Sequence, residues 1–78
     1  MTVEILDCRG QRCPLPVIAL ARRVAEVDEG TTIRVLADDP AAAVDIQAWC
    51  RMRGYEYVGE STVDGGVAYE VRARRISK

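Results

Sequence analysis

Histidine and phenylalanine are both absent from this chain of 78 residues, and each absence excludes a class of functional site. Without histidine, the chain cannot form a Ser-His-Asp triad, a Cys-His pair or any metal site with an imidazole ligand. Aromatic residues make up only 5% of the sequence, so a surface on which nucleic-acid bases stack is not expected. Any chemistry must come from other side chains.

The chain also lacks a long hydrophobic run and an excess of either charge. Its 11 basic and 12 acidic residues give a net charge of −1, whereas binding to nucleic-acid phosphates or anionic membranes depends on a basic excess. The first residues include Glu4 and do not form a signal peptide, and no segment approaches the roughly 20 apolar residues of a membrane span. We expect a cytoplasmic protein that binds neither membranes nor nucleic acids directly.

Cysteine is scarce but present, at positions 8, 13 and 50. An odd number of cysteines cannot form a closed set of disulfides, so at least one thiol is free, as is usual in the reducing cytoplasm. The spacing between Cys8 and Cys13, with no histidine, does not match a zinc or iron–sulfur ligand set. We therefore expect no metal and no other cofactor.

The composition, 49% hydrophobic and 29% charged, is typical of a globular protein, and the length predicts a single domain over residues 1–78. Apolar and β-branched residues predict strands over residues 3–6, 32–37, 55–62 and 67–74. Apolar residues at helical spacing predict helices over residues 14–27 and 41–52. This β-α-β-α-β-β order predicts an α/β two-layer sandwich, a mixed four-stranded sheet with two helices on one face.

Local residue preferences indicate where these elements begin and end. Pro14 and Pro16 fit the first turn of the first helix, where proline is tolerated. Asp39 is expected to cap the second helix, with Pro40 as its first residue and Gly54 at its end. A tight hairpin is predicted at residues 64–66. The inward face of the second helix is predicted to consist of Ala42, Ile46, Trp49 and Cys50.

Cys13 is the strongest candidate for a reactive residue. It directly precedes Pro14 at the expected start of the first helix, where the helix dipole favours a thiolate. Arg12 is adjacent and Arg9 lies four residues earlier, so both charges are expected to lower the pKa of the thiol. The alternative role, a small buried apolar side chain, is less suited to a polar loop before proline.

The segment Cys13-Pro14-Leu15-Pro16 resembles the CPxP motif of the TusA/SirA/YedF family of small sulfur-carrier proteins. Asp7 and Gly10 match the pattern that precedes this motif in the family. The similarity covers nearly the whole chain and includes Asp38-Asp39-Pro40, Asp45-Ile46 and Gly54-Tyr55-Glu56. The resemblance implies the same β-α-β-α-β-β sandwich, which is similar to the C-terminal domain of a bacterial translation initiation factor.

The resemblance also implies a sulfur carrier, or sulfurtransferase, that works through a persulfide on Cys13. A cysteine desulfurase or a rhodanese-like protein would donate the sulfur, and a cysteine of a DsrE-like or other acceptor protein would receive it. The pathway served would be tRNA thiolation, molybdenum-cofactor synthesis or sulfur oxidation. Persulfide transfer is similar to disulfide exchange, so it needs an accessible thiolate but neither a metal nor a general base. A monomer is expected.

The supporting residues implied by the motif are Asp7, Arg9, Gly10, Arg12, Pro14 and Pro16. The arginines and the helix N-terminus would favour the anionic persulfide, and the prolines would fix the position of the sulfur. Asp7 could orient the loop by accepting backbone N–H groups, or it could pair with Arg9 or Arg12, which would weaken their effect on Cys13. The sequence leaves both roles of Asp7 open.

The other two cysteines have competing roles. Cys8 could be a resolving thiol that attacks the Cys13 persulfide, or a loop thiol without a role, which we favour. Cys50 is expected to belong to the core. Asp38 and Asp39 could form an acid–base pair, but helix capping explains Asp39 more simply.

Two other functions remain open. The chain could be a non-enzymatic regulatory or interaction module. An RNA-associated form of this module is also open, although the near-neutral charge of the chain counts against RNA binding. It could also be a redox protein with Cys8 and Cys13 as its dithiol. A basic strip near the C-terminus is by default a solvated strand face and otherwise a docking site; it consists of Arg72, Arg74, Arg75 and Lys78. Residues 75–78 are expected to fray.

Overall fold

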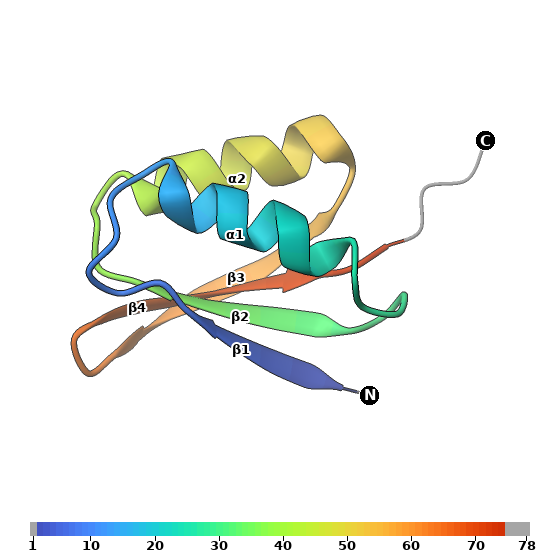
Figure 1. The fold of residues 1–78 in the computed structure, drawn as a ribbon, viewed down its shortest axis with the longest axis horizontal. Coiled ribbons are helices and arrows are strands. Elements are labelled where there is room, and N and C mark those ends of the chain that lie inside the picture. Colours follow the sequence, from blue (N-terminus) through green and yellow to red (C-terminus); the bar gives the residue numbers. More distant parts are fainter. Residues whose placement is uncertain (1, 75–78) are drawn as a thin grey trace.

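A computed structural model describes residues 2–74 and contains six elements in the predicted order (Figure 1). The four strands are β1 (Val3–Asp7), β2 (Thr32–Ala37), β3 (Glu56–Val63) and β4 (Gly66–Arg72). The two helices, α1 (Leu15–Val24) and α2 (Ala42–Arg53), cover the same face of the sheet (Figure 1). The predicted two-layer sandwich is confirmed. Residues 75–78, for which fraying is expected, lie outside the described residues. Arg75 and Lys78 of the basic strip are among them.

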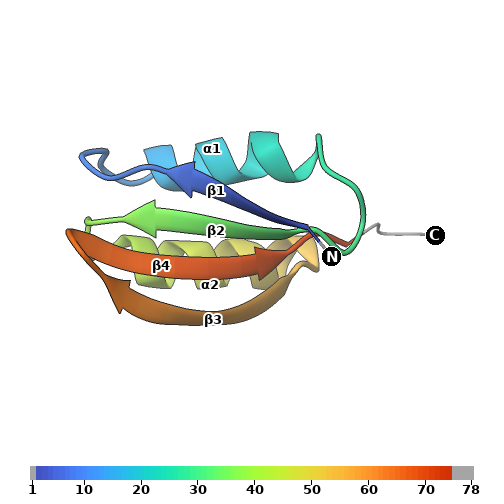
Figure 2. The ribbon, with the colours of Figure 1, turned by 90° about the horizontal axis from the view of Figure 1, so that it is seen from below.

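The strands form one mixed sheet in the order β1-β2-β4-β3 (Figure 2). β1 and β2 are parallel, whereas β4 is antiparallel to both β2 and β3. Val3, Thr32 and Arg72 lie side by side near one end of the sheet, while Asp7 pairs with Leu36 towards the other end. Because β1 and β2 run the same way, the loops that follow them meet at the same end of the molecule.

The core lies between the sheet and the helices. On β2, Ile33, Val35 and Ala37 are buried and alternate with half-buried side chains, as expected for a strand with one covered face. Leu20 and Val24 of α1 are buried against this face. The predicted inward face of α2 is confirmed, because all of its members are buried: Ala42, Ile46, Trp49 and Cys50.

The first helix is shorter than predicted at both ends. It begins at Leu15 and ends at Val24, so Pro14 is the N-cap rather than a first-turn residue. Pro16 does lie in the first turn, and it is fully buried. A proline here removes no intrahelical hydrogen bond, because first-turn N–H groups have no partner within the helix. Pro16 therefore attaches the start of α1 to the core.

The predicted cap of the second helix is wrong. The N-cap of α2 is Ala41, and no side chain caps the helix. Asp39 instead accepts a hydrogen bond from the Ala41 N–H at 3.0 Å, which forms a turn ahead of the helix and leaves Pro40 outside it. The predicted end at Gly54 is confirmed, with a left-handed φ of 79°. Within residues 2–74, neither helix is both long and apolar enough to cross a membrane.

Candidate functional site

Cys13 lies at the junction of the β1–α1 loop and α1, directly before the helix N-cap Pro14. Its side chain is half-buried, and its thiol is free. The neighbouring β2–α2 loop supplies Asp38 and Asp39 at the same end of the molecule (Figure 1). A surface pocket of about 390 Å³ lies between the two loops and is lined by Gly10, Gln11, Arg12, Asp38, Asp39 and Pro40.

Two aspartates of the β2–α2 loop hold the loop that bears Cys13. Asp39 Oδ2 accepts a hydrogen bond from the Cys13 N–H at 2.9 Å, while its Oδ1 accepts the bond from Ala41. Asp38 Oδ2 accepts a hydrogen bond from the Gly10 N–H at 2.9 Å. Gly10 has a φ of 85°, a left-handed conformation that favours glycine. These bonds fix the backbone of Cys13 from a segment 26 residues away.

Arg9 is held by Asp7 and does not act on Cys13. Asp7 accepts hydrogen bonds from Arg9 Nε at 2.9 Å and from Arg9 Nη2 at 2.7 Å. These bonds, with a further one from the Arg9 N–H, lower the pKa of Asp7 to about 2. Arg9 Nη1 also donates to the carbonyl oxygen of Asp64 in the β3–β4 turn, at 3.0 Å. Both roles left open for Asp7 are present, because its carboxylate accepts the backbone N–H of Arg9 at 3.1 Å and also pairs with the Arg9 guanidinium.

The expected low pKa of Cys13 is wrong. Burial, a hydrogen bond from the thiol to the Asp45 carboxylate, and the negative charges of Asp45 and Asp39 raise the pKa of Cys13 to about 11. Asp45 lies in the first turns of α2 and faces the start of α1. Arg12 is exposed. Hydrogen bonds from the Ala41 and Cys13 N–H groups are the main causes that lower the pKa of Asp39, and the charge of Arg12 lowers it further. The thiol therefore lies in acidic rather than basic surroundings.

An apolar groove of about 230 Å³ lies beside Cys13, between the start of α1 and the middle of α2. It is lined by Pro14, Val17, Asp45, Ala48, Trp49 and Met52. Asp45 is the charged member of this set, and its carboxylate is also one of the groups that raise the pKa of the Cys13 thiol. Asp45 therefore connects the groove to the surroundings of Cys13.

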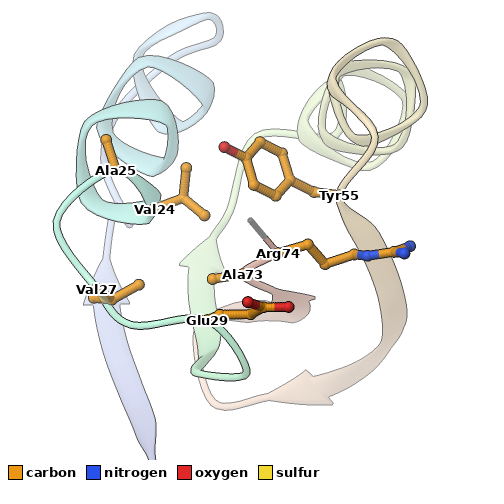
Figure 3. A pocket seen from close by; sticks show the side chains of 7 residues that line it. All are labelled: Val24, Ala25, Val27, Glu29, Tyr55, Ala73 and Arg74. Atoms are coloured by element: carbon orange, nitrogen blue, oxygen red, sulfur yellow. The ribbon is translucent and has the colours of Figure 1, made fainter. Parts of the chain in front are cut away.

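Another pocket, of about 290 Å³, lies at the opposite end of the helix pair (Figure 3). Val24, Ala25 and Val27 line it from the end of α1, and Glu29 and Arg74 carry its charges. No cysteine lines this pocket. This pocket therefore lies at the other end of the helix pair from the Cys13 thiol.

The sequence and the fold of the chain can also be compared with those of known proteins. The family model described as sulfurtransferase TusA matches residues 4–73. The chain belongs to the TusA family. Among its TusA-family relatives are two candidate sulfur carrier proteins of Neisseria meningitidis, one from serogroup A and one from serogroup B. Each is 37% identical over 65 residues, which cover 83% of this chain and 88% of the relative.

The fold of this TusA-family chain is similar to the crystal structure of a SirA-like protein from Desulfitobacterium hafniense. The TM-score is 0.79 and the sequence identity is 25%, and the match covers 95% of this chain and 100% of that chain. The resemblance to the TusA/SirA/YedF family is confirmed. Membership of the TusA family assigns the chain to the sulfur carriers, a class that works with sulfur donors and acceptors.

The cysteines of this TusA-family chain differ sharply in exposure. Cys8 is 1% exposed and Cys50 is 2% exposed, and both belong to the hydrophobic core. Burial is the largest cause that raises the pKa of each. This burial favours the alternative in which Cys8 has no part in the chemistry, because a resolving thiol must reach the persulfide. The arrangement also disfavours a Cys8–Cys13 dithiol.

Sequence reasoning missed the roles of Asp38, Asp39 and Asp45. The sequence predicts a cap for Asp39, weighs Asp38 only as its partner in an acid–base pair, and includes Asp45 only in the family resemblance. The presence of all three in the segments that resemble the family is the available signal. Sequence alone does not reveal that Asp39 and Asp45 act on Cys13 while Asp38 holds Gly10 of the same loop, because these contacts connect separate loops and helices.

Proposed function

We propose that Cys13 carries sulfane sulfur as a persulfide. The observation that supports this most directly is the contrast in exposure: Cys13 is half-buried at a loop-to-helix junction, whereas Cys8 and Cys50 are sealed in the core. Transfer of sulfur between proteins requires a thiol that a second protein can reach. Membership of a family described as a sulfurtransferase supports sulfur chemistry for the chain.

The transfer exchanges one S–S bond for another. The Cys13 sulfur, once deprotonated, attacks the outer sulfur of a donor persulfide, and a new S–S bond forms. The donor's S–S bond breaks, its electron pair leaves with the donor cysteine sulfur, and that sulfur takes up a proton equivalent to the one that Cys13 lost. In the second step an acceptor thiolate attacks the outer sulfur, and Cys13 leaves as a thiolate and is reprotonated. Neither step changes the total oxidation level.

We propose a cysteine desulfurase or a rhodanese-like protein as the donor, and a DsrE-like or other cysteine-containing protein as the acceptor. The acceptor would lead to tRNA thiolation, molybdenum-cofactor synthesis or sulfur oxidation. The three free thiols fit a reducing compartment such as the cytoplasm. The proposed unit is a monomeric single domain that needs no cofactor.

Intact-protein mass spectrometry tests the proposal directly. The purified chain is incubated with cysteine and a cysteine desulfurase, and we expect a gain of one sulfur atom that a reducing agent reverses. Cys13→Ser should abolish the gain, whereas the double variant Cys8→Ala/Cys50→Ala should retain it. If Cys13→Ser still gains sulfur, or if the double variant does not, the assignment of the carrier to Cys13 is wrong.

A further inference from the structure

The groove beside Cys13 has the composition of a binding surface. Apart from Asp45, its lining is apolar and comes from both helices. Met52, which lines the groove, is 78% exposed, and Ala48 in the same lining is also exposed. Large apolar side chains that cluster at the surface next to a reactive group mark a site of protein interaction. A complementary partner would place an apolar side chain in this groove.

The charges around the groove specify the partner further. Asp45 lies between the groove and the Cys13 thiol, and within residues 2–74 no arginine or lysine forms an ion pair with it. Asp39 adds a second negative charge next to Cys13. Electrostatic complementarity therefore calls for a cation from the partner at this position.

We propose that the groove is the docking site of a sulfur-transfer partner, which inserts an apolar side chain between α1 and α2 and sets a lysine or arginine against Asp45. The inference rests on the proposed function, because it names the chemistry of the partner that meets Cys13. The same cation would offset the negative field of Asp45 and Asp39 on the thiol, and so favour the ionised form of Cys13 when the partner is docked. Docking would thus both align the two sulfur atoms and activate one of them.

A second copy of this chain does not fit the groove as well. In a symmetric dimer the same patch is present on both sides of the interface. The Asp45 and Asp39 carboxylates of both copies would then approach one another, and like charges across an interface are unfavourable. A partner with a basic and apolar segment avoids this repulsion.

Three short synthetic peptides test the chemistry of the partner without requiring its identity. Each contains one cysteine, activated as a mixed disulfide with 2-thiopyridine. The first peptide has a leucine before the cysteine and two lysines after it, the second has glutamates in place of the lysines, and the third has serine in place of the leucine. The Cys13 thiolate attacks the peptide sulfur, a Cys13–peptide disulfide forms, and thiopyridine leaves with the electron pair and a proton. Its absorbance gives the rate.

We expect the lysine peptide to react about two- to fivefold faster than the glutamate peptide, as for an exposed ion pair, and the difference to shrink in high salt. The leucine should increase the rate by up to about tenfold relative to serine, because it buries apolar surface in the groove. Cys13→Ser should remove the reaction with all three peptides.

Matched variants separate the two contributions. Asp45→Asn should reduce the preference for lysine, with Asp39 retaining part of it, and should keep the preference for leucine. Ala48 is exposed and lines the groove. Ala48→Trp should fill the groove, so that the preference for leucine is lost and the preference for lysine is kept. Glu29→Gln removes an exposed acid from the far pocket and should leave both preferences intact. Thermal unfolding of each variant verifies that the fold is retained.

Equal rates with the three peptides would overturn the docking proposal, as would a lysine preference that is undiminished in Asp45→Asn. A concentration-dependent dimer that masks Cys13 in sedimentation experiments would assign the groove to a second copy and would also overturn it. Persulfide loading by a desulfurase is measured separately. If Cys13 loads but shows no preference among the peptides, only the docking proposal fails, and if Cys13 does not load, the carrier function fails.

Discussion

At the scale of single residues, the half-buried Cys13 is a thiol held in its protonated form. Burial contributes most to its raised pKa, and the carboxylates of Asp45 and Asp39 raise the pKa further. A protonated thiol is a weak nucleophile, and a cysteine of high pKa is a slow leaving group in sulfur exchange. The same surroundings would therefore slow the loss of sulfur from a Cys13 persulfide to unintended thiols.

The pH dependence of alkylation tests this account of Cys13. Because the pKa of Cys13 is about 11, the thiolate fraction at pH 7 is far below that of free cysteine, for which the pKa is about 8.5. The greater intrinsic reactivity of a basic thiolate offsets part of the difference. We expect iodoacetamide to modify Cys13 about 10- to 30-fold more slowly than free cysteine at pH 7, with a rate that still rises above pH 9.

Asp45→Asn removes one negative charge that favours the protonated form, so the pKa of Cys13 should fall and the rate at pH 8 should increase several-fold. Glu29→Gln, at the far end of the molecule, is the control and should match the unmodified protein. A wild-type profile that levels off below pH 8 would contradict the raised pKa. The measurement follows Cys13 by peptide mapping, because the chain contains two further cysteines.

At the scale of elements, the site depends on contact between two loops. The parallel arrangement of β1 and β2 brings the loops that follow them to one end of the sheet. Asp39 then joins the Cys13 N–H to the start of α2, and Asp38 holds Gly10. Arg9 connects the first loop to the β3–β4 turn through the Asp64 carbonyl oxygen. The position of Cys13 is thus set by three segments of the chain.

Asp39→Ala should loosen this arrangement, because two backbone N–H groups lose their acceptor. We expect a loss of about 1–2 kcal/mol in the free energy of unfolding and faster hydrogen exchange of the Cys13 and Ala41 amides. Asp64→Ala is the matched control, since Arg9 binds the backbone oxygen of Asp64 and not its side chain. Unchanged exchange at both amides in Asp39→Ala would show that the carboxylate does not hold the loop.

The sequence predicted the elements well and the electrostatics of the site badly. Alternation in residues 32–37 and helical spacing around Ile46 and Trp49 reflect burial along one segment, which local patterns record. The pKa of Cys13 depends instead on Asp39 and Asp45, which belong to other segments. A prediction of the pKa from neighbouring residues includes the two arginines. It does not include the carboxylates that folding brings close to Cys13 from other segments.

At the scale of the whole molecule, the two faces of the sheet differ in what they contact. One face packs on the helices (Figure 1), and the other carries the ion pairs Arg34–Glu70 and Arg72–Glu56, with shortest nitrogen–oxygen distances of 3.9 and 3.2 Å. Arg72 of the predicted basic strip is therefore already paired. Exposed pairs of this kind contribute little to stability, so the fold depends mainly on the covered face.

Gly66 tests how closely the central strands are packed. It begins β4, and a Cβ atom there would overlap the carbonyl oxygen of Ala37 at the end of β2. Because backbone must move to relieve that overlap, Gly66→Ala should lower the free energy of unfolding by about 1–3 kcal/mol in urea titrations. Ser61→Ala, at an exposed position of β3, should change it by less than about 0.5 kcal/mol. Equal stability of the two variants would contradict this packing.

The strand register also has a practical consequence for capturing partners. Val3 and Arg72 both align with Thr32, whereas the chain turns into the thiol-bearing loop beyond Asp7, at the other end of β1. The described segment thus begins and ends on the side remote from the sulfur, and an affinity handle joined to either end would be attached to that side. Protein immobilised on a resin by such a handle would present the reactive tip outward, so partners trapped as mixed disulfides could be recovered without obstruction by the support.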